Sequence, residues 1–232
     1  MRLLFANPNT TESMTTAIAA GAAAVARAGT VIEAVNPVTG PPSIENEDDE
    51  RRCVPGLLAV LRAAAARPAD RRPDAYVVAC FGDPGLEQAR EMLDAPVLGI
   101  AQAAMHAAGL ATGSFSVVTS MSATVSRAWQ LAKTYTPAQC LGVHACDIPV
   151  LRIDTDPTTI GPIGELCATA LDQDRSGSIV LGCAAMARFA EPLSRLLGVP
   201  VIDGVVAATL LAEALVEVAP TAGHPRGTDI IS

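Results

Sequence analysis

Residues 75–86 read AYVVACFGDPGL, an apolar run that ends in a cysteine and gives way to a turn rich in glycine and proline. Residues 178–186 read SIVLGCAAM, a second apolar run that also ends in a cysteine. After each of them the chain returns to a short apolar run, 96–100 (PVLGI) or 200–204 (PVIDG), and then to an alanine-rich stretch. A unit of strand, cysteine, loop, helix, strand and helix therefore occurs twice in this chain.

Apolar runs alternate with helical stretches rich in Ala and Leu along the rest of the sequence. We predict strands at 2–6, 31–35, 75–80, 96–100, 115–119, 149–153, 178–182 and 200–203. We predict helices at 11–27, 53–66, 86–93, 101–109, 123–134, 160–171, 185–197 and 205–218. Continuous apolar strands with helices between them indicate parallel sheets covered on both faces. The repeat favours an α/β fold of two pseudo-symmetric lobes, each a roughly four-stranded sheet flanked by helices, over a single barrel.

The repeat also places the lobe boundaries. We expect 1–98 to form the first lobe and 99–204 the second, with 205–232 packing back on the first lobe. The tail at 221–232 has the composition of a loosely ordered segment. Residues 36–52 combine a proline-rich turn with an acidic run, which is typical of a solvated loop; a lid over the cleft is the alternative interpretation.

Composition excludes several classes of function. The 232 residues carry a net charge of −8, 3% aromatics and a single lysine, Lys133, so the chain lacks the basic, aromatic surface that binds nucleic acid. The N-terminal apolar stretch is too short for a secretion signal, and acidic residues interrupt the apolar segment at 201–219, which therefore reads as a core helix. We expect a cytoplasmic protein without membrane contact, whose six cysteines are reduced thiols.

Two of the cysteines, Cys80 and Cys183, differ from the others because each lies where a strand ends. In parallel sheets ligands bind beyond the carboxyl ends of the strands, so Asn9, Cys80, Thr119 and Cys183 should meet at one edge. Free N–H groups at a following helix stabilise a thiolate. Two thiols that face each other across a cleft can act as base and acid on opposite faces of one carbon, without a cofactor.

Such chemistry also needs donors for the oxygen that becomes negative. The backbone N–H groups of Phe81, Gly82, Ala184 and Ala185 could supply them. The side chains of Asn9 and Thr119 could help, and Ser120 lies in the same loop as Thr119. Each of these residues also has a structural interpretation.

The structural interpretations stay open at this point. Asn9 could simply cap the first helix, and Thr119 and Ser120 could cap the helix that begins near Ala123. Asp83 could be a carboxylate base, but the sequence around it favours a turn.

The remaining chemistry-bearing residues favour no second site. Cys53, Cys140, Cys146 and Cys167 are typical buried small side chains. Cys140 and Cys146 flank His144, but no further ligand has the spacing of a zinc site, so we expect no metal. The glycines lack the spacing of a phosphate-binding loop. No Cys-x-x-Cys pair indicates a thiol–disulfide enzyme.

Several motifs make the chain resemble a known family. They are 7–11 (NPNTT), 40–45 (GPPSIE), 80–86 (CFGDPGL), 182–186 (GCAAM) and 198–204 (GVPVIDG). With these motifs in this order, the sequence from residue 2 to about 215 closely resembles the hydantoin racemases. That family includes allantoin racemases and belongs to the aspartate/glutamate racemase superfamily.

The resemblance implies inversion at C5 of a 5-monosubstituted hydantoin or of allantoin. It implies that Cys80 and Cys183 are the acid/base pair, with no cofactor and no metal, and that the protein is a homo-oligomer. Asn9, Thr119 and the backbone at 81–82 and 184–185 would hold the ring. Many relatives have Gly where this chain has Ala185, whose methyl group we expect to narrow the pocket.

Other functions remain alternatives. Within the superfamily they are an amino acid racemase, a maleate cis–trans isomerase and an arylmalonate decarboxylase, although the last uses one cysteine. Outside enzymes, a two-lobed sensor would bind a small molecule without turning it over. A neutral ring suits the pocket better than a dicarboxylic amino acid, because Phe81 follows Cys80 and few basic residues lie in the cleft loops.

Overall fold

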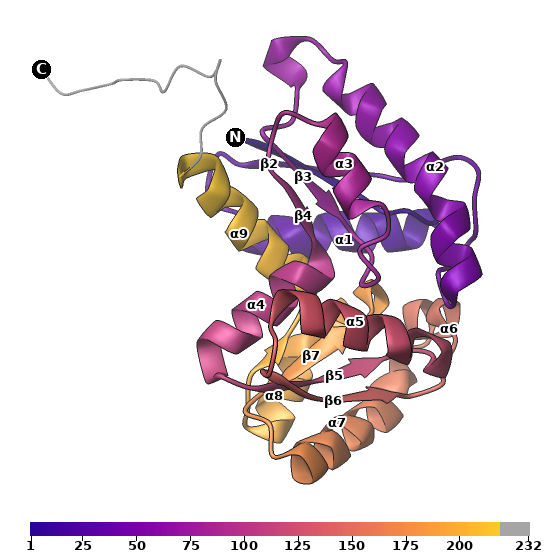
Figure 1. Ribbon diagram of the computed structural model, residues 1–232, viewed down its shortest axis with the longest axis vertical. Helices are drawn as coiled ribbons and strands as arrows, with labels where there is room; N and C mark the ends of the chain where they lie inside the picture. The colour runs from indigo at the N-terminus through magenta and orange to yellow at the C-terminus, as the bar shows by residue number, and fades with distance from the viewer. Residues whose placement is uncertain (219–232) are drawn as a thin grey trace, which may run out of the picture.

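The computed structural model describes residues 1–218, which form two α/β lobes, each built on a four-stranded parallel sheet (Figure 1). The strands of the first sheet are β1 (Arg2–Ala6), β2 (Val31–Val35), β3 (Ala75–Val78) and β4 (Val97–Gly99). The strands of the second are β5 (Phe115–Thr119), β6 (Cys140–Ala145), β7 (Ile179–Gly182) and β8 (Val201–Ile202). The predicted fold class is confirmed.

The two sheets have the same topology. Their strand orders are β2-β1-β3-β4 and β6-β5-β7-β8, and every pairing is parallel. The central strands β3 and β7 are buried along their whole length, as their continuous apolar sequences require. Ala6 pairs with Val78 and Thr119 with Gly182, so equivalent strand ends lie side by side in each lobe.

Helices cover both faces of each sheet. They are α1 (Glu12–Val25), α2 (Glu47–Ala65), α3 (Leu86–Met92), α4 (Ile100–Thr112), α5 (Val125–Tyr135), α6 (Val150–Thr155), α7 (Ile160–Asp174), α8 (Ala190–Leu197) and α9 (Gly204–Val218). Short 3-10 helices occur at Ala69–Arg71, Ser122–Thr124, Pro157–Thr159 and Ala184–Phe189. The faces of α2 and α3 bury one side of the first sheet, and α1 and α9 bury the other.

The helices α4 and α9 join the two lobes. Both follow the last strand of a sheet, and they pack along each other (Figure 1). One face of α4 packs on the second sheet through Ala101, Ala104 and Met105. Ala208 and Ala212 of α9 belong to the core of the first lobe. Small side chains on both helices allow this close approach. The division into 1–98 and 99–204 stays a prediction, and the predicted loose tail at 221–232 lies outside the described residues.

Two predicted elements are wrong. Residues 149–153, predicted as a strand, lie mostly in the short helix α6, and the edge strand of the second sheet is β6 instead. Residues 47–52, predicted as part of a loop, form the first turns of α2, because the side chain of Asn46 accepts a hydrogen bond from the N–H of Asp49 (3.0 Å) and caps the helix. Within residues 1–218 no helix is both long and apolar enough to cross a membrane.

Candidate active site

A pocket opens between the lobes, at the carboxyl ends of β1, β3, β5 and β7. It is lined by Asn9, Met14, Ile44, Glu50, Ala79, Cys80, Phe81, Gly82, Thr119, Ser120, Thr124, Arg127, Ala128, Val150, Gly182, Cys183 and Ala184. All of the site residues predicted from the sequence line it, except Ala185. The methyl group of Ala185 belongs to the apolar cluster of the second lobe, with Met186 and Leu181, and not to the pocket wall.

Cys80 lies two residues after the end of β3 and is partly accessible from the pocket. Burial raises the pKa of its thiol well above the ordinary value, while the N–H of Gly82 lowers it by donating to the sulfur. The chain does not enter a helix here: it turns through Asp83 and Gly85, both with positive φ (45° and 67°), before α3 begins. The donor to Cys80 is therefore a turn amide and not a helix N-terminus.

Cys183 lies at the equivalent point after β7. Burial raises the pKa of its thiol to about 11, and the N–H of Ala185 and the hydroxyl of Ser120 act in the opposite direction. The chain enters a 3-10 helix at the next residue, Ala184. Each cysteine thus receives a hydrogen bond from the amide two residues further on, in a turn in one lobe and in a 3-10 helix in the other.

The two thiols also act on each other. A negative charge on Cys183 raises the pKa of Cys80, so the two sulfurs favour a state with at most one thiolate. A thiolate that is desolvated in this way is a stronger base than an exposed one, once it forms. This arrangement can move a proton onto one sulfur and deliver another from the second.

Asn9 combines the two roles left open by the sequence. Its side-chain oxygen accepts hydrogen bonds from Asn7 Nδ2 and from the N–H of Thr11, both at 2.9 Å, and so holds the turn before α1. Its amide nitrogen faces Met14 Sδ at 3.5 Å, a weak acceptor. The amide donors of Asn9 therefore have little competition from the protein for a ligand in the pocket.

The hydroxyl of Thr119, unlike the amide nitrogen of Asn9, already has good hydrogen-bond partners within the protein. Its hydroxyl donates to the carbonyl of Gly182 at 3.2 Å and lies 2.9 Å from Thr124 Oγ1. These contacts tie the end of β5 to the end of β7, next to Cys183. The side chain of Thr119 supports the pocket wall, whereas Ser120, one residue on, has its hydroxyl at the Cys183 sulfur.

Two charged residues of the pocket were not found from the sequence. Arg127 on α5 donates from Nε and Nη2 to the carbonyl of Gly82, at 3.0 and 2.8 Å. Its Nε lies 3.6 Å from Glu50 Oε2 on α2. Burial raises the pKa of Glu50, and the positive charge of Arg127 lowers it. These side chains link the first lobe to the second beside the loop at 79–85 between β3 and α3, here named the Cys80 loop.

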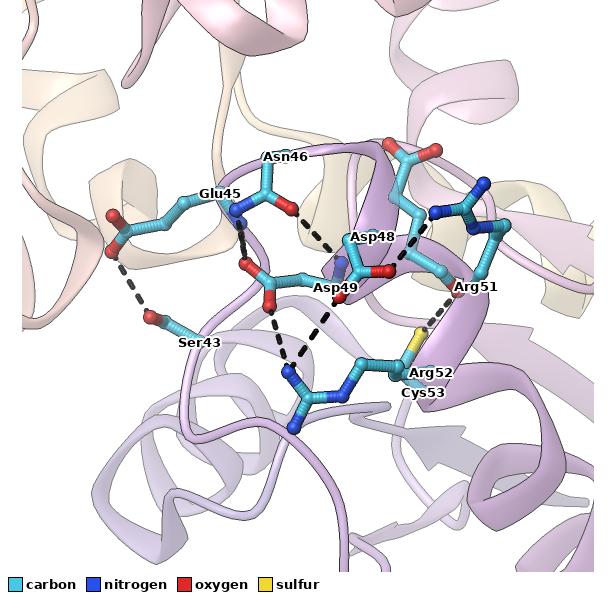
Figure 2. Close-up of polar contacts among 9 residues, drawn as sticks. Ser43, Glu45, Asn46, Asp48, Asp49, Arg51, Arg52 and Cys53 are labelled. Atoms are coloured by element: carbon cyan, nitrogen blue, oxygen red, sulfur yellow. Dashed lines mark hydrogen bonds and ion pairs between the residues drawn. The ribbon is translucent and has the colours of Figure 1, made fainter.

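The segment before α2 closes another side of the pocket. Ile44 lines it, and Glu45 Oε1 accepts hydrogen bonds from Ser43 Oγ and from the N–H of Val150 on α6, both at 3.0 Å. Figure 2 shows Ser43 and Glu45 beside the capped start of α2. This part of residues 36–52 is thus a wall of the cleft that contacts both lobes, and not a plain solvated loop.

Asp83 has a structural role outside the pocket lining. Its carboxylate accepts hydrogen bonds from the N–H groups of Ala101 (3.1 Å) and Gln102 (2.9 Å) at the start of α4, and from Tyr135 Oη at 3.1 Å. Burial raises the pKa of Asp83 to about 7, against the effect of these hydrogen bonds. Asp83 therefore forms the predicted turn and also caps a helix.

The remaining cysteines do not line the pocket, although Cys146 Sγ lies 3.5 Å from the carbonyl oxygen of Ser120, which does. Cys53 and Cys167 are buried, and Cys140 Sγ faces the carbonyl of Gly142. His144 Nε2 lies 2.7 Å from Asp174 Oδ2 and not between cysteines. Across residues 1–218 no three His, Cys, Asp or Glu side chains converge as a metal site.

Comparison with known proteins assigns the family. The sequence model of the Asp/Glu/Hydantoin racemase family matches residues 3–212. The chain belongs to the Asp/Glu/Hydantoin racemase family. It is an isomerase of the racemase type.

Individual relatives agree along nearly the whole chain. A hydantoin racemase from Rhizobium meliloti is 42% identical over 217 residues, which cover 93% of this chain and 88% of that protein. The structure of an allantoin racemase from Klebsiella pneumoniae has a TM-score of 0.90 at 42% identity and covers 100% of this chain and 96% of its own. The allantoin racemase from Pseudomonas fluorescens has a TM-score of 0.87 at 33% identity, with 100% of both chains covered.

Proposed function

We propose that this racemase inverts C5 of a 5-monosubstituted hydantoin, allantoin included, by proton transfer between Cys80 and Cys183. The observation that carries the proposal is the placement of both thiols in the wall of one pocket, each with a backbone donor two residues further on. The similarity to hydantoin and allantoin racemases supports the choice of ring.

The reaction needs only the two sulfurs and the ring. The thiolate of one cysteine takes the proton from C5, and the electron pair moves into the ring carbonyl as an enolate. The thiol of the other cysteine then gives its proton to the opposite face of C5, which inverts the centre. The two cysteines exchange protonation states, so the reverse reaction uses them in opposite roles, and no cofactor or metal takes part.

The pocket offers groups for the enolate oxygen. The amide nitrogen of Asn9 is directed at a weak acceptor only, so it is free to donate to a ring oxygen. The N–H groups of Phe81 and Ala184 complete the proposed set of donors. The apolar lining from Met14, Ile44 and Val150 suits a neutral ring.

The test is chiral analysis of single-enantiomer allantoin and 5-benzylhydantoin, incubated with the protein in deuterated buffer that contains a chelator and no added cofactor. We expect inversion, with one solvent deuteron at C5 of the inverted product. If neither ring is inverted or exchanged, the proposed function is wrong, and glutamate, aspartate, maleate and arylmalonates become the substrates to test.

The proposal includes a setting for the protein. Because thiol chemistry requires reduced cysteines, we place the protein in the cytoplasm. Large apolar side chains are exposed at Leu110, Leu196 and Val38, which is consistent with a homo-oligomer. Light scattering after size exclusion measures the oligomeric state, and a monomeric mass would contradict this part of the proposal.

A further inference from the structure

Glu50 is held rigidly at the start of α2, at the mouth of the pocket. Asn46 and Asp49 cap the helix reciprocally: Asn46 Oδ1 accepts from the N–H of Asp49 at 3.0 Å, and Asn46 Nδ2 donates to Asp49 Oδ2 at 2.8 Å (Figure 2). Asp49 Oδ2 also accepts from the N–H of Glu45 at 3.2 Å. Glu50 follows this cap directly, so the position of its backbone is fixed by the cap.

The carboxyl group of Glu50 lies against the Cys80 loop. A Cβ atom added to Gly82 would lie 2.4 Å from Glu50 Oε1, so the carboxyl group lies directly against the backbone of this loop. The Glu50 side chain is 15% exposed. A groove over α2 and α5 continues outward from the pocket and shares Glu50, Thr124 and Arg127 with it.

Within the described chain no hydrogen bond reaches either oxygen of this carboxyl group. Its ionic partner, Arg127, is 3.6 Å away and gives Nε and Nη2 to the carbonyl of Gly82. Burial has taken part of the water from this carboxyl group, and the protein supplies no hydrogen-bond donor in its place. Two acceptor oxygens in a pocket wall, neither of them sealed from solvent, are therefore available to the donors of a ligand.

The position of these oxygens selects the kind of donor. For the proposed reaction C5 must lie between the sulfurs of Cys80 and Cys183. We take its substituent to point outward, toward Glu50, where the pocket and the groove meet. A carboxylate with both oxygens free matches two parallel N–H donors on one planar group. A ureido substituent presents such a pair, whereas an alkyl or aryl substituent presents none.

We propose that Glu50 is a specificity-determining residue that accepts two hydrogen bonds from a ureido group on C5, and thereby favours ureido-substituted hydantoins over alkyl-substituted ones. This inference rests on the proposed function. A substrate with an apolar substituent displaces water from the carboxyl group and brings no donor, and sites built for hydrogen bonding reject such analogues strongly.

The experiment compares two rings that differ only in the donors of the substituent. Allantoin carries the ureido group, and 5-isobutylhydantoin carries a branched alkyl group of similar size and shape. For each single enantiomer, kcat/KM is measured with the unaltered protein and with Glu50→Gln. We expect the ratio of kcat/KM, allantoin over 5-isobutylhydantoin, to fall about 10- to 100-fold in Glu50→Gln, because one acceptor is replaced by a donor.

The matched control is Glu91→Gln, which removes the same charge from an exposed position of the neighbouring helix α3, outside the pocket and the groove, and should leave the ratio within about twofold. An unchanged ratio in Glu50→Gln, with both rates lowered alike, would overturn the inference, since Glu50 would then act on the fold or on the Cys80 thiol. If the unaltered protein inverts neither ring, the proposed function fails. Calorimetric binding then decides the role of Glu50: equal affinity of both proteins for allantoin overturns it, and weaker binding to Glu50→Gln supports it.

Discussion

The Cys80 loop and the Cys183 loop occupy equivalent places in the two lobes but are restrained in different ways. In the first lobe, Asp83 of the cysteine loop caps α4, and Arg127 of the second lobe holds the carbonyl of Gly82. In the second lobe the helix cap is local: Asp203, at the end of β8, accepts from the N–H groups of Val205 and Val206 at the start of its own helix α9.

The difference shows which contacts determine the surroundings of each thiol. The Cys80 loop is fixed by contacts that cross between elements and lobes, so its geometry depends on the assembled fold. The Cys183 thiol is adjusted by a nearby side chain, the hydroxyl of Ser120, and the 3-10 helix that follows Cys183 packs against α1 and α6. Both thiols are desolvated by burial and accept one backbone hydrogen bond of the same kind, and they differ in the side chains and loops around it.

The largest effect is expected from replacing each sulfur in turn. Cys80→Ser and Cys183→Ser should each lower kcat/KM for inversion by about 10³-fold or more, because one acid/base group is lost. Each variant should still exchange the C5 proton of one enantiomer through its remaining thiol, and the two variants should act on opposite enantiomers. Proton NMR in deuterated buffer measures this exchange. Exchange of the same enantiomer by both variants would show that the thiols do not face opposite sides of the carbon.

The next effect concerns the cap that only the Cys80 loop provides. A Cβ atom at Gly99 would lie 2.1 Å from Cγ of Asp83, so Gly99→Ala should lower the free energy of unfolding by about 3 kcal/mol, measured in urea. Gly161→Ala is the matched control, since nothing lies within 4 Å of a Cβ atom there. Adding Asp83→Ala to Gly99→Ala should cost less than the two changes summed; additive losses would mean that the two residues do not clash.

The pH dependence of the free energy of unfolding should show that the pKa of Asp83 is raised in the folded protein. Its pKa in the folded protein is raised to about 7, so the folded state keeps a proton that the unfolded state releases near pH 4. The stability of the protonated form is therefore lost as the pH rises through about 7. Relative to Asp83→Asn, the original protein should lose at least about 2 kcal/mol between pH 4 and 8. If the free energies of unfolding of the two proteins, measured in urea, change with pH in the same way across this range, the pKa of Asp83 is not raised in the folded protein.

The smallest effect is expected at Ser120, which has no counterpart beside Cys80. Ser120→Ala removes a hydrogen bond that stabilises the Cys183 thiolate, so the pKa of Cys183 should rise by about one unit and kcat/KM at neutral pH should fall about tenfold. The pH–rate profile and the alkylation rate of Cys183, followed by peptide mass spectrometry, measure the shift. Ser122→Ala, an exposed change in the same loop, serves as the control. If the pH–rate profile of Ser120→Ala is not shifted, the Ser120 hydroxyl does not lower the pKa of Cys183, and this difference between the two thiols does not exist.

Much of the fold could be predicted from the sequence because the strands of the repeat are continuous apolar runs. The edge strand β6 was missed because Gly142 and His144 interrupt its apolar pattern, and an edge strand needs no burial on both sides. A short segment such as 149–153 (PVLRI), apolar except for Arg152, suits a short helix as well as a strand. The start of α2 could have been recognised, since Asn46 and Asp49 have the spacing of a helix cap.

The site divides in the same way. The residues at strand ends, such as Cys80 and Thr119, were predictable because parallel strands bring their carboxyl ends together. Glu50 and Arg127 were not, because each is a charged residue on a helix, and only the packing of α2 against the Cys80 loop and α5 turns both toward the pocket. The second role of Asp83 likewise depends on the approach of α4, which no local pattern records.

The return of α9 to the first lobe has a consequence for how the chain is made. Leu3, Phe5 and Ile18 pack with Val205 and Ala208, so the core begun by the first strand is completed by residues translated after the whole second sheet. Domains commonly fold as units in the order in which they leave the ribosome. The second lobe can therefore complete its core before the first lobe does. One apolar face of the first sheet stays uncovered until α9 has left the ribosome.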